Sequence, residues 1–127
     1  MEESKGDNMK YKSIVASGTH RGVEWYTCKS PFYGINGYMR IPEGHPWHDL
    51  TYREINGRVC TEHLDGGAWE LTYHADDAWI GFDTQHAWDY WPDSYYPTVA
   101  GDTAWTPELV AENARRWCDL IADEVAA

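Results

Sequence analysis

The sequence predicts an α+β fold, a two-layer sandwich in which a mostly antiparallel sheet of short strands is covered by one long C-terminal amphipathic helix. Two observations support this prediction. Short β-prone runs recur from residue 11 to residue 83, and Gly, Pro, Asn and Asp separate them. The C-terminal segment instead places apolar residues at helical spacing. Short strands followed by a single amphipathic helix are typical of a sheet with one covered face.

The composition indicates one folded domain. A chain of 127 residues suits a single hydrophobic core, and 43% of its residues are hydrophobic. There are eight Trp and nine Tyr but only two Phe. Trp and Tyr combine a large apolar body with a polar group, which suits a half-solvated pocket or interface as well as a core. We expect a flexible polar tail over residues 1–8 and a single domain over residues 9–127.

The first expected strands form a hairpin. Residues 11–17 and 23–29 are β-prone, and the Gly-flanked residues 18–22 between them provide the turn, with His20 and Arg21 at its tip. A loop is expected over residues 34–37, followed by a β-prone run from Tyr38 to Ile41 that Pro42 stops.

The middle of the chain combines breakers with short β-prone runs. Pro46 restricts its own φ and the conformation of His45, so the loop Gly44-His45-Pro46 can present an imidazole to a ligand or serve only as a turn. A helical turn is expected over residues 50–55, and strands over residues 58–62 and 68–74. Gly66 and Gly67, between those strands, allow a close backbone approach to a ligand or a tight turn.

The C-terminal helix has the clearest signals. Thr106 is a good N-cap, Pro107 fits the first helical position, and Glu108 suits the positive end of the helix dipole. One stripe of apolar residues then recurs at helical spacing: Val110, Ala114, Trp117, Ile121 and Val125. We expect this stripe to form the core against the sheet.

An apolar strand over residues 79–83 runs into the cluster Asp83-x2-His86-x2-Asp89. If the chain turns helical after the strand, the three side chains share one face. Two carboxylates can orient an imidazole as a general acid or base, so Asp83, His86 and Asp89 are candidate catalytic residues. The same residues could ligate a divalent metal, or they could have only a structural role as hydrogen-bonded polar side chains that cap a turn. We assign no metal and no cofactor.

The net charge limits the classes of binding partner that we expect, and the cysteine content indicates the cellular compartment. The formal net charge of −11 argues against duplex nucleic acid or an anionic membrane as the main partner, although it leaves room for a small anionic ligand. Three widely spaced cysteines without a Cys-x-x-Cys pair are typical of reduced thiols in a cytoplasmic protein. The polar N-terminus has no signal-peptide pattern, and no segment is long and apolar enough for a transmembrane helix.

Several segments resemble a family of small proteins that are encoded mainly by bacteriophages and actinobacteria and whose function is not settled. The resemblance spans roughly residues 37–126, and its most specific part is Gly81-Phe82-Asp83-x2-His86-x2-Asp89. The other matching segments are Gly37-Tyr38, Ile41-Pro42, Gly44-His45-Pro46, and Gly66-Gly67 with Thr72-Tyr73 after His63. The family usually has an uninterrupted His-Gly-Gly, whereas Leu64 and Asp65 separate His63 from Gly66 in this chain.

Three functions are consistent with these observations. The first is a phage-encoded accessory protein in the host cytoplasm that binds a small polar, nucleotide-like ligand and so counters a host defence signal. Its expected ligand-binding residues are His45, His63, Gly66, Gly67, Trp79 and Trp88. The second is a small hydrolase with His86 as its base, and the third is a direct inhibitor of a host enzyme through the acidic surface. The sequence does not decide between an enzyme and a binding protein. The short edges of the expected sheet are compatible with a homodimer.

Overall fold

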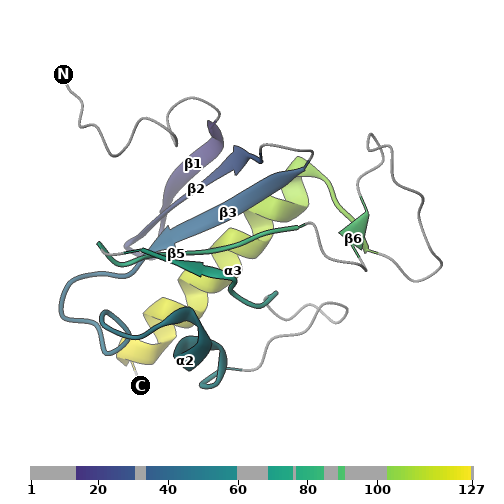
Figure 1. Ribbon diagram of the computed structural model, residues 1–127. Helices are drawn as coiled ribbons and strands as arrows, with labels where there is room; N and C mark the ends of the chain where they lie inside the picture. Colours follow the sequence, from purple (N-terminus) through teal and green to yellow (C-terminus); the bar gives the residue numbers. More distant parts are fainter. Residues whose placement is uncertain are drawn as a thin grey trace.

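A computed structural model of the protein describes residues 14–30, 34–59, 69–75, 77–84, 89–90 and 103–126 (Figure 1). It confirms the α+β fold, with a five-stranded sheet packed against a C-terminal helix, α3, Pro107–Ala126. The strands lie in the order β1-β2-β3-β5-β4, and each neighbouring pair is antiparallel. The expected tail over residues 1–8 lies outside the described residues.

The sheet strands are β1 Ile14–His20, β2 Val23–Lys29, β3 Ile35–Arg40, β4 Tyr73–His74 and β5 Trp79–Phe82. A short helix, α2, covers Tyr52–Asn56 between β3 and β4, where the sequence predicted a helical turn. Two further strands, β6 Asp89–Tyr90 and β7 Thr103–Ala104, pair with each other in parallel. The strand expected over residues 79–83 is confirmed as β5, which lies between β3 and the short edge strand β4.

The hairpin turn is shorter than the sequence suggested. β1 continues to His20, so the expected turn over residues 18–22 is wrong, and only Arg21 and Gly22 connect β1 to β2. These two residues have φ values of 52° and 84°. Positive φ at both central residues defines a tight turn whose twist matches that of the flanking strands, which is why two residues suffice to reverse the chain.

β3 begins within the segment where a loop was expected. Ile35, Asn36 and Gly37 are strand residues, and Gly37 pairs with Phe82 of β5. A Cβ atom at Gly37 would overlap the ring of Phe82. The glycine is therefore present to make room for a buried ring, and it does not mark a turn.

Where a strand was expected over residues 68–74, the backbone groups of Trp69 and Leu71 are bound by side chains, and the Thr72 N–H donates to the Gly81 carbonyl at 2.8 Å. Of the described part of that run, Tyr73 and His74 form a strand. Asn56 Nδ2 donates to the carbonyl of Leu71, and the Leu71 N–H donates back to Asn56 Oδ1, both at 2.9 Å. The Trp69 N–H donates to Asn113 Oδ1 at 3.0 Å. Side-chain amides thus satisfy backbone groups that a strand partner would otherwise satisfy. The strand expected over residues 58–62 is also absent from its described part, because Arg58 and Val59 lie in a turn.

The core lies between the sheet and α3. Thr106 is the N-cap predicted for α3, since its Oγ1 accepts a hydrogen bond from the Leu109 N–H at 3.1 Å. The predicted apolar stripe is confirmed for Val110, Ala114, Trp117 and Ile121, which are all fully buried. They pack in one cluster with the inward residues of the sheet, which include Val23, Trp25, Met39, Ile80 and Phe82.

Candidate functional site

One face of the sheet is covered by α3, and the opposite face, which we call the open face, is not covered by any helix among the described residues (Figure 1). Alternation along β2 shows the division: Val23, Trp25 and Thr27 are buried, whereas Glu24 and Tyr26 are at least partly exposed. Alternation and register therefore place one set of residues on the open face: Glu24, Tyr26, Cys28, Asn36, Tyr38, Arg40, Tyr73, Trp79, Gly81 and Asp83.

Four aromatic side chains from four strands meet on this face, and we call them the ring cluster: Tyr26, Tyr38, Tyr73 and Trp79. Tyr26 and Tyr38 stack with centroids 5.0 Å apart and planes 25° apart. Trp79 meets Tyr26 edge-on at 5.1 Å, and Tyr73 meets Tyr38 edge-on at 5.5 Å. The four rings thus form one continuous apolar surface rather than isolated side chains.

Gly81 allows this cluster to close. Both Tyr38 of β3 and Tyr73 of β4 pair with Gly81, one from each side of β5. A Cβ atom at Gly81 would lie 2.5 Å from Cδ1 of Tyr38. Because the glycine has no side chain, the two tyrosine rings can meet above it.

Charged groups border the ring cluster. The Arg40 guanidinium carbon lies 5.9 Å from the centre of the Trp79 ring, and Arg40 Nη1 lies 3.7 Å from Glu24 Oε1. Burial raises the pKa of Tyr38 to about 12, with further upward contributions from Cys28, Tyr73 and Asp83 and an opposing hydrogen bond from Asn36. Burial also raises the pKa of the Cys28 thiol. A negative charge on these groups is therefore disfavoured.

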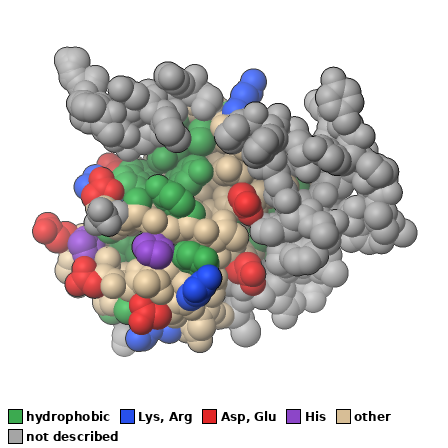
Figure 2. Space-filling view, viewed as in Figure 1, with side chains coloured by type: hydrophobic (Ala, Val, Ile, Leu, Met, Phe, Trp, Pro, Cys, Tyr) green, Lys and Arg blue, Asp and Glu red, His purple; other side chains and the backbone are tan. Residues whose placement is uncertain are grey.

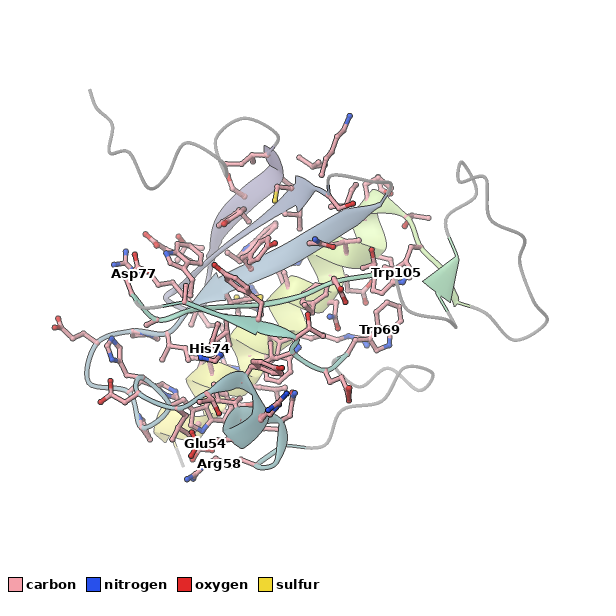
Figure 3. The ribbon with its side chains drawn as sticks, in the orientation of Figure 1. Glu54, Arg58, Trp69, His74, Asp77 and Trp105 are labelled. Atoms are coloured by element: carbon pink, nitrogen blue, oxygen red, sulfur yellow. The ribbon has the colours of Figure 1, made fainter. Side chains whose placement is uncertain are left out.

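A hollow of about 500 Å³ adjoins the cluster at Arg40. It is lined by Gly22, Glu24, Arg40, Ile41, Pro42, Glu43, His48 and Asp77. Asp77 lies in the turn that precedes β5, two residues before Trp79 (Figure 3). In the same orientation, Figure 2 shows hydrophobic side chains gathered on the visible surface with acidic and basic groups around them.

His45, one of the predicted ligand-binding residues, has both ring nitrogens occupied by the chain itself. Nδ1 accepts a hydrogen bond from the Trp47 N–H at 2.9 Å, so Nε2 is the nitrogen that donates, to the carbonyl of Ile121 at 2.7 Å. The side chain is 5% exposed and also borders a hollow of about 340 Å³ beside α3. His45 therefore ties its loop to the C-terminal part of the helix.

The structure does not bring His45 together with Asp83. His45 follows the Arg40 end of β3 and binds α3, whereas Asp83 follows β5 at the opposite end, where Thr84 Oγ1 donates to the carbonyl of Ile35 at 2.9 Å. Trp79 lies on the open face, as a stacking role requires. Tyr26, Tyr38 and Arg40 of the same face were missed by the sequence analysis. The alternation of residues 23–29 could have placed Tyr26 on one face, but not shown which face stays open.

The remaining predicted site residues lie outside the described residues: His63, Gly66, Gly67, His86 and Trp88. Only the backbone of Asp89 is described, in β6. The catalytic arrangement of Asp83, His86 and Asp89 therefore stays a prediction. Within the described ranges, no group of three or more His, Cys, Asp or Glu side chains is arranged to hold a metal ion. No helix in those ranges is long and apolar enough to cross a membrane.

In comparisons with known proteins, the chain matches no protein-family model, no curated protein and no solved structure. The fold and the open face define a two-layer α+β protein that presents an aromatic sheet surface. The resemblance to the phage and actinobacterial family stays a prediction.

Proposed function

We propose that this protein is a binding protein whose open face takes the flat ring of a small polar, nucleotide-like compound. The observation that carries the proposal is the ring cluster, in which Tyr26 and Tyr38 stack while Tyr73 and Trp79 close its two ends. Aromatic side chains on an uncovered sheet surface bind planar heterocycles by stacking, at about 1–3 kcal/mol per base.

The charge of the protein limits this ligand to a small compound. Long nucleic acids bind by displacing counterions from a basic surface, and a chain with a net charge of −11 lacks the excess of cations that this requires. A single ring compound needs no such surface, since stacking and a few hydrogen bonds provide its affinity.

The biological role that we attach to this binding is the sequestering of a small host defence signal by a phage-encoded protein. It is supported only by the resemblance to a family encoded mainly by bacteriophages and actinobacteria. Sequestering requires a ligand that leaves the protein chemically unchanged, which separates this role from hydrolysis by His86.

A titration with adenosine tests the proposal. We expect adenosine to shift the NMR signals of the ring cluster, and the variants Tyr26→Leu and Trp79→Leu to weaken its binding at least tenfold. Tyr52→Leu is the matched control, because Tyr52 is a partly exposed aromatic residue of α2 outside the ring cluster. Adenosine recovered intact after incubation is the expected result, and its conversion to another compound would instead favour the hydrolase.

A further inference from the structure

We infer that the open face prefers a planar ring compound that carries a basic group and rejects the phosphorylated form of the same compound. This inference rests on the proposed function and narrows the nucleotide-like ligand of the same site to a nucleoside-like compound, which has the ring system but no phosphate. It depends on which charges border the ring cluster and on how they are already paired.

Arg40, the cation that lies beside the ring cluster, already has a carboxylate partner. Arg40 lies over Trp79 and within 3.7 Å of a Glu24 carboxylate oxygen. An entering phosphate would have to displace Glu24 from Arg40 and lie beside the displaced carboxylate. Both side chains are about half exposed, so this pairing is weak, but it leaves Arg40 and Glu24 together with no net positive charge.

The hollow beside the cluster adds further negative charge. Its lining includes three acidic residues, Glu24, Glu43 and Asp77, and two basic ones, Arg40 and His48. Glu43 and Asp77 are exposed, and His48 Nδ1 lies 3.2 Å from Asp49 Oδ1. A substituent extending from a ring on Trp79 toward Arg40 enters this hollow, where an ammonium group is attracted and a phosphate is repelled.

Like the carboxylates, the aromatic rings favour a cationic ligand over an anionic one. The face of a Trp or Tyr ring carries partial negative charge and attracts cations, as the position of Arg40 over Trp79 illustrates.

Three ligands with one ring system and different charges test the inference: 5′-amino-5′-deoxyadenosine, adenosine and adenosine 5′-monophosphate. Calorimetric titration should give the tightest binding for the amine and the weakest for the monophosphate. We expect at least a tenfold difference between these two, which is about the effect of one pair of unit charges roughly 6 Å apart at an effective dielectric constant of about 40. The difference should shrink in about 1 M salt.

A pair of aspartate variants locates the charges that are responsible. Asp77→Asn should reduce the preference for the amine over the monophosphate about threefold, because it removes a carboxylate from the hollow. Asp123→Asn is the matched control, since it removes the same charge from α3. Asp123 pairs with Arg21 at 2.9 Å, but Arg21 keeps its second partner, Asp119, at 3.2 Å, so the preference should be unchanged. Both aspartates are exposed, so both variants should fold.

The outcomes separate this inference from the proposed function. A monophosphate that binds as tightly as adenosine, or an Asp123→Asn effect equal to that of Asp77→Asn, would overturn the inference while the face remained a ring-binding site. Failure of all three compounds to bind at millimolar concentration would overturn the proposed function itself.

Discussion

The two faces of the sheet use aromatic side chains in different ways. On the covered face, the rings of Trp25 and Phe82 are buried against the core that α3 completes. On the open face, Tyr26 and Tyr38 contact each other and stay partly exposed. Both faces also contain a glycine beneath a ring from the strand paired with it, as in Gly37 beneath Phe82 and Gly81 beneath Tyr38. The same local arrangement therefore fills the core on one side and builds a surface on the other.

The largest expected difference between the faces concerns tryptophan. Trp117 is fully buried, and its Nε1 donates to the carbonyl of Trp69 at 2.7 Å. Trp117→Phe should lower the free energy of unfolding by about 2–4 kcal/mol, because it leaves a cavity and an unsatisfied carbonyl. Trp79→Phe, on the open face, should cost less than about 1 kcal/mol. Urea unfolding measures the loss of stability in both variants. Equal losses would contradict the assignment of Trp117 to the covered face and Trp79 to the open face.

The two glycines provide the next comparison. Gly37→Ala should destabilise the fold by about 2–3 kcal/mol, since the ring of Phe82 is fully buried and cannot move aside. Gly81→Ala should cost a similar amount, because its Cβ atom would lie 2.5 Å from Cδ1 of Tyr38 and 2.9 Å from the carbonyl oxygen of Gly37, and the backbone cannot move aside. The displaced Tyr38 ring should also disrupt the ring cluster, so Gly81→Ala, unlike Gly37→Ala, should weaken adenosine binding. Denaturation and binding measured on the same samples test both expectations.

Alkaline pH should affect the faces over different ranges. Burial raises the pKa of Tyr38 from 10.0 to about 12 on the open face, and that of Cys118 from 9.0 to about 12 on α3. Each group keeps its proton more tightly in the folded state, so its contribution to stability is complete below its unfolded pKa and is lost as pH rises toward about 12. The loss should begin near pH 9 for Cys118 and near pH 10 for Tyr38, and it should reach at most roughly 4 kcal/mol for Cys118 and roughly 3 kcal/mol for Tyr38.

Urea midpoints measured between pH 8 and pH 11.5 can separate the two groups. Tyr38→Phe should remove the part of the decline that begins near pH 10, and Cys118→Ala the part that begins near pH 9. A decline that neither variant changes would contradict these assignments.

The smallest expected effect is a stabilisation on the covered face. Thr27 is fully buried, and its Oγ1 has no hydrogen-bond partner within the described part of the chain. Thr27→Val keeps the side-chain shape and removes a buried unsatisfied hydroxyl, so it should raise the free energy of unfolding by about 1 kcal/mol. Thr19→Val, at an exposed position of β1, is the control and should change stability by less than about 0.5 kcal/mol.

Local sequence patterns were sufficient for the elements whose signals lie within a few residues. The cap at Thr106 and the stripe from Val110 to Ile121 predicted α3, and alternating β-prone residues predicted β2. Prediction was wrong where a distant residue decides the conformation. Gly37 resembles a loop glycine until Phe82 is placed above it, and the segment around Leu71 resembles a strand until Asn56 binds its backbone.

For the candidate site, the sequence singled out Trp79 but not the residues around it. Tyr26, Tyr38 and Tyr73 lie far apart along the chain, and only the order β2-β3-β5-β4 brings them onto one face. His45 shows the opposite case. Its loop suggested a ligand-binding imidazole, and the tertiary structure places both ring nitrogens against backbone groups of the chain.

By itself, the sequence determined that this chain forms short strands and one amphipathic C-terminal helix, because propensity, capping and periodicity act between near neighbours. Only the tertiary structure decided which sheet face α3 covers and therefore which aromatic residues stay exposed. Strand order and register depend on contacts between residues far apart in sequence, and these contacts leave no periodic signal in the chain.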